Sequence, residues 1–188
     1  EFRRVLFRST ALQIKIYCGL LAGIDPVLPA KVKLQKLEAI WSGISRSLRQ
    51  IPEVVAAYSE GLAAADAPEK ALNFLSKALK THWHSCLVEA YGRLEIKDAT
   101  KQLALGEQWL VKYPNDPQLL FALGGICRRM GFLGKAKDYM QSTIDAQPSA
   151  QAYHELAAVL ELLGDTKRSA EIYRKGLRFA TQSATEKA

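Results

Sequence analysis

The run His82-Trp83-His84-Ser85-Cys86 gathers side chains that could bind a metal or a haem iron. Imidazole and thiolate groups are common ligands of zinc and of haem iron, and His82 and Cys86 stand about one helical turn apart if both are helical. The run straddles an expected helix junction, however, and neither a second ligand pair at a zinc-like spacing nor a CxxCH motif accompanies it. We therefore expect Trp83 to pack between helical hairpins, the histidines to be solvated, and the chain to hold no metal or cofactor.

Motifs for catalysis are missing from the sequence. Apart from the run above, His154 is the only histidine, so no Ser–His–Asp arrangement can be argued. The sequence contains no GxSxG, GxGxxG or phosphate-binding loop. Gly124-Gly125 falls inside an expected helix, where we expect glycine to permit close packing rather than phosphate binding. We predict that the chain is not an enzyme, and we assign no catalytic residues.

Arginines are the other candidates for binding chemistry. Arg46 and Arg49 lie in one segment, and Arg128 and Arg129 lie in another. Guanidinium groups bind carboxylates and phosphates in bidentate geometry, so these arginines could form an anion-binding wall for acidic peptide side chains, lipid heads or porphyrin propionates. They could equally form a solvated helix face, and the sequence leaves both interpretations open.

The elements that must position these residues are helices. The composition, 48% hydrophobic and 24% charged, is typical of a folded chain with a core. Apolar residues recur at helical spacing, and no sustained strand pattern competes with them. Proline and glycine interrupt the pattern at regular intervals. These breaks predict about ten helices, at residues 11–24, 30–50, 52–65, 68–81, 83–95, 98–113, 117–130, 133–146, 150–163 and 166–181.

Charge and cysteine content limit the classes of partner. The formal net charge is +7, but no basic run or aromatic-interleaved stripe accompanies it, so we expect no nucleic-acid partner. An acidic protein or an anionic membrane surface is compatible with this charge. The three cysteines are widely spaced and odd in number, which indicates no disulfide framework. No apolar run reaches the roughly 18–20 residues that a membrane-spanning helix needs.

The two ends of the chain are expected to differ from the middle. Residues 1–9 read as the literal translation of a widely used sequencing adapter. We expect them to be non-native and to pack against nothing, and the natural protein to continue upstream of Thr10. The remaining chain divides into a divergent helical part at 10–51, a repeat region at 52–181 and a disordered tail at 182–188.

The repeat region follows the tetratricopeptide pattern, which pairs two antiparallel helices over about 34 residues. A small residue recurs at Ser59, Gly92, Gly124 and Ala157, at separations of 33, 32 and 33 residues. One hairpin cannot bury its apolar face alone, so such units must stack. We predict an all-α, tetratricopeptide-like right-handed solenoid of antiparallel helical hairpins, with repeats at about 52–82, 83–116, 117–149 and 150–181. Further packing positions are Ala71, Ala136, Tyr153 and Tyr173.

An ordered series of short segments carries a resemblance to a known family. The series is Tyr91-Gly92-Arg93-Leu94, Trp109-Leu110, Pro114-Asn115-Asp116, Leu123–Arg128, Gly134-Lys135-Ala136, Tyr153–Ala157 and Tyr173–Leu177. In order and spacing it resembles the C-terminal region of the HemY family, the tetratricopeptide proteins of proteobacterial inner membranes associated with haem biosynthesis. One departure is Leu133, where the family usually has tryptophan. The family's N-terminal membrane-spanning part has no counterpart in this sequence.

The resemblance implies the context in which the domain would act. It implies an inner-membrane protein whose soluble helical domain, on the cytoplasmic side, is a scaffold or partner of enzymes in late haem or porphyrin metabolism. Membrane attachment would come from an N-terminal anchor upstream of this sequence, and the present segment alone would be soluble. The resemblance brings no catalytic residues to this chain.

The first helix of each tetratricopeptide hairpin lines a concave groove, so the repeat phase predicts which residues meet a partner protein. Two arginines beside an aromatic side chain predict a ligand with apolar anchors and acidic groups. Two alternatives to a protein-binding scaffold stay open: a haem or porphyrin carrier that uses His154 or the His82/His84 pair, and a generic assembly or secretion protein unconnected to haem. The predicted groove residues are Glu60, Glu89, Arg93, Phe121, Arg128, His154 and Glu161.

Overall fold

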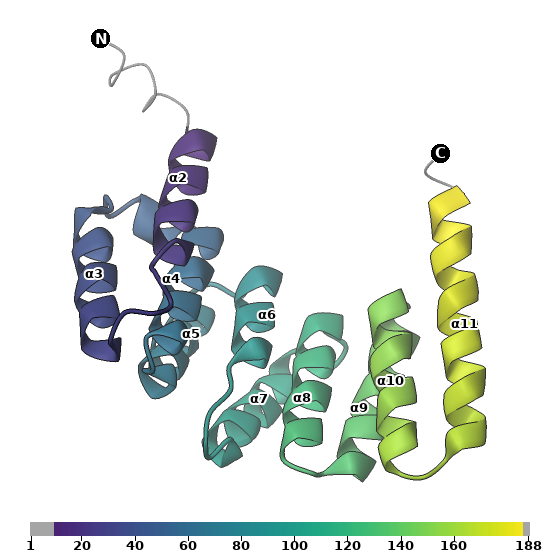
Figure 1. Ribbon diagram of the computed structural model, residues 1–188. Helices are drawn as coiled ribbons and strands as arrows, with labels where there is room; N and C mark the ends of the chain where they lie inside the picture. Colours follow the sequence, from purple (N-terminus) through teal and green to yellow (C-terminus); the bar gives the residue numbers. More distant parts are fainter. Residues whose placement is uncertain (1–9, 186–188) are drawn as a thin grey trace. The chain divides into compact units, whose positions relative to one another are not determined.

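Helices account for all the regular secondary structure in residues 10–185, the part of the chain that the computed structural model describes. The described range contains ten α-helices, and they are joined by short connections (Figure 1). One 3-10 helix, η1 at Leu48–Gln50, accompanies them. The α-helices are α2 (Thr10–Ala22), α3 (Ala30–Gly43), α4 (Pro52–Ala64), α5 (Pro68–Thr81), α6 (Ser85–Arg93), α7 (Thr100–Lys112), α8 (Pro117–Arg129), α9 (Leu133–Ala146), α10 (Ala150–Leu162) and α11 (Thr166–Thr185).

Helix starts follow from local sequence chemistry. Helices α4, α5 and α8 begin with proline, which is tolerated there because the first-turn N–H has no partner inside the helix. The Asp116 side chain accepts a hydrogen bond from the Leu119 N–H at 2.9 Å, and the Ser149 hydroxyl accepts one from the Ala152 N–H at 3.1 Å. Each cap satisfies one of the donors that a helix N-terminus leaves unpaired.

Helix ends inside the hairpins use the left-handed backbone region. Gly131 has φ 78° and Gly164 has φ 81°, and these residues turn α8 into α9 and α10 into α11. Glycine has no Cβ, so it adopts this conformation without the steric cost that other residues meet. Asp66, with φ 60°, makes the corresponding turn between α4 and α5. Aspartate is one of the few other residues that tolerate this region.

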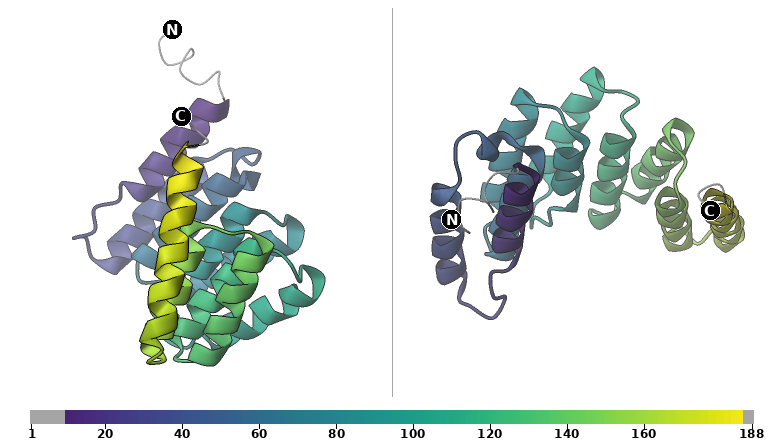
Figure 2. Two further views of the ribbon diagram at one scale, coloured as in Figure 1. Left: turned by 90° about the vertical axis from the view of Figure 1, so that its right-hand side faces the viewer. Right: turned by 90° about the horizontal axis from the view of Figure 1, so that it is seen from above.

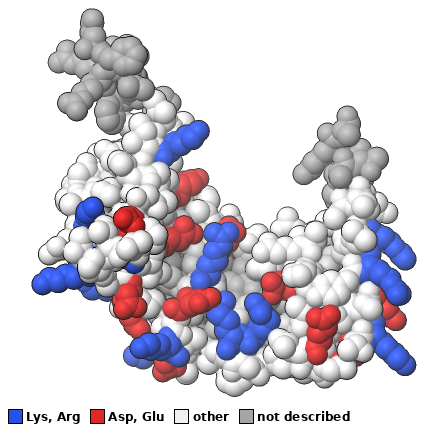
Figure 3. All heavy atoms as spheres, viewed as in Figure 1, with Lys and Arg blue, Asp and Glu red and all other residues white. Residues whose placement is uncertain are grey.

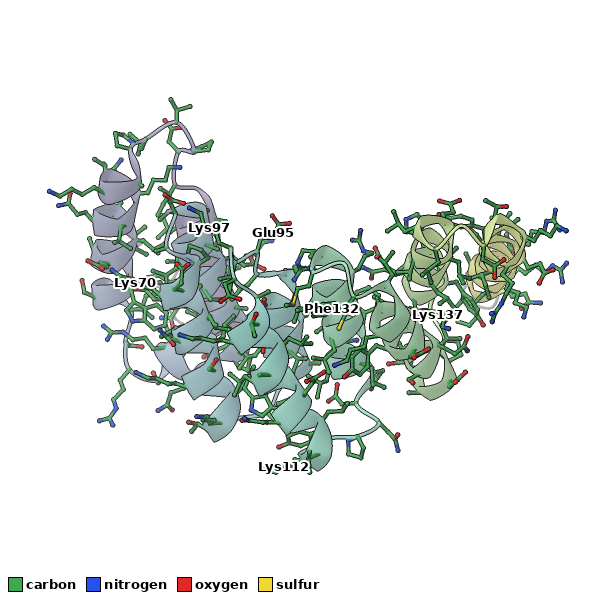
Figure 4. The ribbon with its side chains drawn as sticks, turned by 90° about the horizontal axis from the view of Figure 1, so that it is seen from below. Lys70, Glu95, Lys97, Lys112, Phe132 and Lys137 are labelled. Atoms are coloured by element: carbon green, nitrogen blue, oxygen red, sulfur yellow. The ribbon has the colours of Figure 1, made fainter. Side chains whose placement is uncertain are left out.

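The chain forms two compact units that divide after Ile96. Unit 1 contains α2 to α6, and unit 2 contains α7 to α11. Residues 94–99 lie between α6 and α7, and Figure 4 labels Glu95 and Lys97 on this connection.

Unit 1 is built around the α4–α5 hairpin. The ring of Trp41 on α3 stacks on Tyr58 of α4 at a centroid distance of 4.1 Å, and both rings meet the edge of Phe74 on α5. Helix α2 packs mainly against α4 rather than against α3. The aromatic cluster therefore holds α3, α4 and α5 together.

The predicted helix over residues 30–50 is wrong, because α3 ends at Gly43 and only η1 follows. Ile44 has an extended backbone (φ −77°, ψ 133°) and its side chain is buried. The Arg49 guanidinium donates hydrogen bonds to the carbonyls of Ser42 and Ile44, both at 2.8 Å, and thereby satisfies acceptors that the end of the helix leaves open. Arg49 also lies over the Trp41 ring, 5.6 Å from its centroid.

Unit 2 contains two complete hairpins, α8–α9 and α10–α11, which lie side by side in Figures 1 and 2. A core of buried apolar side chains lies between them. It comprises Met140 and Ile144 of α9 and Ala152, Leu156 and Leu160 of α10, with Phe121, Tyr153 and Ile172 packed against it. Stacking of successive hairpins thus buries apolar faces that one hairpin would expose.

Two expectations about the chain ends have different outcomes. The prediction for residues 1–9 lies outside the described residues. Helix α11 extends to Thr185, so residues 182–185 are helical rather than part of the expected disordered tail. None of the helices in the described range is both long and apolar enough to cross a bilayer.

Candidate functional site

The small residues predicted at the helix crossings lie mostly in the packed interior. Ser59, Gly124 and Ala157 are buried, whereas Gly92 is partly buried. A Cβ added to Gly124 would lie 2.7 Å from Met140 Cε and 3.1 Å from Met140 Sδ, distances that real Cβ atoms do not normally show. Gly124 therefore lies at a close approach of α8 to α9.

The other predicted packing positions are also either fully buried or half-buried. Ala71 on α5 and Ala136 on α9 are fully buried. Tyr153 is half-buried against the core between the unit 2 hairpins. Tyr173 on α11 is half-buried and lies beside the His154 ring, at a centroid distance of 5.6 Å.

Two close approaches were missed by the repeat pattern. A Cβ on Gly176 of α11 would lie 2.7 Å from Tyr153 Cβ, and one on Gly61 of α4 would lie 2.5 Å from Leu37 Cδ1. Glycine inside a helix costs stability unless the position needs it. Both glycines stand inside predicted helices, so their presence there could have indicated a close contact with another helix.

Three of the predicted groove residues come together in unit 1, and we call them the unit 1 face: Glu60 on α4 with Glu89 and Arg93 on α6. All three side chains are exposed. The Arg93 guanidinium pairs with the Glu60 carboxylate at 3.4 Å and with the Glu89 carboxylate one helical turn away. The pairs are too exposed to contribute much stability, but they place α4 and α6 residues on a common surface.

The other four predicted groove residues lie in unit 2, and we call them the unit 2 face: Phe121 and Arg128 on α8 with His154 and Glu161 on α10. Arg128 Nε lies 3.3 Å from Glu155 Oε2. Nε is shielded from solvent and makes no hydrogen bond, so the contact is an ion pair without hydrogen-bond geometry. Glu155 is a functional candidate that the repeat phase missed. In the sequence, Glu155 is an acidic residue beside His154, and nothing in that position indicates that it pairs with Arg128 on α8.

The remaining members of the unit 2 face differ in exposure. His154 and Glu161 are exposed, whereas Phe121 is half-buried and packs against the hairpin core. Burial raises the pKa of the Tyr173 hydroxyl, and the carboxylates of Glu161 and Glu155 raise it further. Both carboxylates therefore act on the same side of α11.

The charges of these faces bear on the predicted ligand preference. The sequence suggested two arginines free to attract acidic groups. Arg93 instead shares the unit 1 face with two glutamates, and Arg128 is paired with Glu155. On the unit 1 face the carboxylates outnumber the guanidinium, so this surface favours cationic groups of a ligand.

The His82–Cys86 run forms a helix junction, as expected. His82 follows the end of α5, and His84 caps α6 by accepting a hydrogen bond from the Cys86 N–H on Nδ1 at 3.3 Å. Both histidines are exposed. Among the described residues, no three His, Cys, Asp or Glu side chains lie together in a way that could hold a metal ion.

A basic surface that sequence reasoning did not single out runs along α11. Figure 3 shows Lys and Arg side chains gathered over this helix. Because positions three, four and seven residues apart share a helix face, Lys167, Arg174 and Arg178 form one row. No ion pair to another described residue engages these side chains. The exposed cations of α11 are Lys167, Arg168, Arg174, Lys175 and Arg178.

No protein-family model matches the chain, and no curated protein matches it. Solved structures of MamA are similar to it. MamA from Desulfovibrio magneticus RS-1, residues 41 to the end, is 21% identical with a TM-score of 0.56, over 90% of this chain and 96% of that one. A double mutant of the RS-1 protein is 19% identical with a TM-score of 0.57, over 92% and 97% of the two chains.

A further crystal structure of MamA is 15% identical with a TM-score of 0.59, over 82% of this chain and 95% of that one. At such identities the likeness concerns the fold alone. It confirms the fold class predicted from the sequence, an all-α array of tetratricopeptide-like helical hairpins.

Proposed function

We propose that this chain is a non-catalytic scaffold that binds a partner protein through the first helices of its hairpins. The observation that carries the proposal is the unit 2 face, where Arg128 of α8 and Glu155 of α10 pair at 3.3 Å beside the exposed His154. Consecutive hairpins thus present charge, an imidazole and half-buried aromatic side chains on one surface. Such a mixture suits recognition of a peptide segment by repeat proteins.

We further propose that the partners belong to late haem or porphyrin metabolism at a bacterial inner membrane. This part rests on the resemblance of the ordered segments between Tyr91 and Leu177 to the HemY family. The likeness to MamA supports the repeat fold that such a scaffold needs, and it carries no information about haem.

Affinity capture from solubilised bacterial membranes tests the scaffold function. The bait is wild type or Arg128→Glu, and the matched control is Arg178→Glu on α11, which changes the net charge by the same amount. Arg128→Glu places a second carboxylate beside Glu155, so we expect it to lose the captured protein. The loss should correspond to about 2 kcal/mol, the low end for a charge pair that is partly desolvated. Circular dichroism serves as the folding control.

Two readouts separate the parts of the proposal. If Arg128→Glu retains the same partner at the same salt sensitivity while the chain stays folded, the unit 2 face is not the binding site. If the captured proteins include no enzyme of haem or porphyrin synthesis, the haem assignment is wrong and the scaffold function stands without it.

A further inference from the structure

Unit 1 contains an apolar pocket of about 330 Å³ between α2, the connection that follows it, α3 and α4. This volume lies at the small end of the range for ligand pockets and is far larger than the space that one water needs. Most of the lining is apolar: Leu21, Ala22, Ile24, Pro26, Ala57, Gly61 and Ala64, with Lys33 and Glu60 as the charged members.

The pocket lining carries one carboxylate, Glu60, and one ammonium group, Lys33, and further carboxylates lie beyond the lining. Glu60 belongs to the unit 1 face, its side chain is 51% exposed, and it shares the single Arg93 with Glu89. Glu53 lies seven residues before Glu60 on α4, so it is on the same helix face, and it is exposed. Lys33 is the opposing charge, but its ammonium group donates a hydrogen bond to the Ala64 carbonyl at 3.3 Å.

The helix that walls the pocket leaves much of its own apolar surface open. Helix α2 has the mostly apolar sequence TALQIKIYCGLLA, in which Leu21 is the only fully buried residue and several other apolar residues are half-buried. Leu20, next to the lining residue Leu21, is 49% exposed. A surface of this kind is normally covered, because apolar area in water is unfavourable. The pocket therefore offers an accessible apolar site with Glu60 in its lining.

We propose that this pocket receives an apolar side chain of a partner segment that carries Lys or Arg next to that side chain. The inference rests on the proposed scaffold function, because the ligand is a segment of a partner protein. The apolar side chain leaves water on entering the pocket, and the flanking cations meet Glu60 and Glu53. A segment with acidic flanks would meet like charges there, which is a penalty for the wrong partner.

Charge also decides between a protein segment and a lipid. An anionic lipid would bring phosphate or carboxylate groups toward Glu60 in the lining, toward Glu53 on the same face of α4 and toward Glu89, which shares Arg93 with Glu60. The Arg93 guanidinium is already paired with Glu60 and Glu89, and the three carboxylates outnumber Lys33 and Arg93. A basic peptide segment with one apolar anchor is therefore the ligand that the site fits.

Fluorescence anisotropy with short labelled peptides tests the proposal on the full chain. The main probe has one central Leu flanked on both sides by Arg in a neutral Ala/Gln background. One matched probe replaces Leu by Ala, and another replaces both Arg residues by Glu. We expect binding of the main probe, about tenfold weaker binding of the Ala probe, and no measurable binding of the Glu probe.

Protein variants locate the site. Ala64→Phe fills the pocket from an exposed position, so it should weaken binding of the main probe at least about tenfold. Ala104→Phe, also at an exposed alanine but on α7, should bind like the wild type. Glu60→Gln should weaken binding several-fold and reduce its salt dependence. Thermal unfolding shows whether each variant is folded.

Three results would overturn the inference: no binding of the main probe at millimolar concentration, equal binding of the Arg and Glu probes, or unchanged binding by folded Ala64→Phe. The capture experiment with Arg128→Glu tests a different face on unit 2. A captured partner that does not depend on Arg128, combined with binding of the main probe, would reject the unit 2 site and leave the unit 1 pocket in place. Binding of the main probe without any captured partner would instead count against the scaffold function.

Discussion

Gly124 is the residue at which the repeat pattern makes its sharpest physical demand. Its missing Cβ would stand 2.7 Å from Met140 Cε, so even alanine requires Met140 to move. Gly134, on the first turn of α9, has open space around the same position. The two glycines thus separate the effect of crowding from the general effect of removing a glycine from a helix.

Gly124→Leu should destabilise the chain by about 1–3 kcal/mol, because the larger side chain forces α8 and α9 apart. Gly134→Leu should change stability little or raise it slightly. Urea unfolding of both variants, followed by circular dichroism at 222 nm, measures the difference. Equal unfolding midpoints for the two variants would mean that α8 and α9 do not meet tightly at Gly124.

Cys127 and Tyr139 make stability depend on pH in the alkaline range. Burial, with a smaller contribution from Glu107, raises the pKa of the Cys127 thiol from 9.0 to about 11. Burial and then the charge and hydrogen bond of Glu107 raise the pKa of the Tyr139 hydroxyl from 10.0 to about 12. The folded chain therefore holds both protons at pH values where the unfolded chain releases them.

The contribution of Cys127 and Tyr139 to the free energy of unfolding should be constant below about pH 9. It should fall as pH rises from 9 toward 12. Urea unfolding at pH 8, 9.5 and 10.5 measures the slope. Tyr139→Phe removes one of the two groups, so its slope above pH 10 should be smaller than that of the wild type. A steeper slope for Tyr139→Phe would contradict the assignment.

At the scale of elements, the helices could be predicted because their boundaries have local causes. Proline starts α4, α5 and α8, and glycine with positive φ ends α8 and α10. The break after Gly43 could not be predicted in this way. It depends on burial of Ile44 and on the long-range reach of Arg49, neither of which leaves a periodic signal.

Arg49→Ala should loosen α3, because it leaves the Ser42 and Ile44 carbonyls without their donor and uncovers the Trp41 ring. We expect a loss of about 1–3 kcal/mol, in the range for hydrogen bonds from a charged donor. Arg46→Ala, at an exposed position nearby, is the control. Hydrogen exchange of the α3 amides reports the local effect, and equal protection in the two variants would show that Arg49 does not hold the end of α3.

The sequence predicted which residues share a surface of the candidate site, but it did not predict which charged side chains form ion pairs. The phase of the tetratricopeptide repeat was sufficient to place Glu60, Glu89 and Arg93 on one surface of unit 1. The pairing of Arg128 with Glu155 joins residues of different hairpins, and charge sign by itself does not reveal which acid and base meet. The acidic character of the unit 1 face was missed for this reason, and the predicted preference for acidic ligands remains a prediction that the Arg93 ion pairs do not favour there.

At the scale of the whole molecule, positive charge is unevenly distributed along the sequence. Helix α11 contains five basic residues and one acidic residue, so it carries a net charge of +4 of the chain's +7. This field raises the rate of encounter with anionic partners and is screened by salt. Arg178→Glu in the capture experiment therefore also reports whether binding depends on general charge or on Arg128 in particular.

The central claim is that a partner protein lies on the first-helix surface of the hairpins. Site-specific photocrosslinking tests it most directly, with p-benzoylphenylalanine in place of His154 on α10 or of Gln141 on α9, both of which are exposed. The account predicts a crosslinked partner from His154 that disappears when Arg128→Glu is added, and none from Gln141. Crosslinking from Gln141 but not from His154 would contradict it and would place the partner on the second helices.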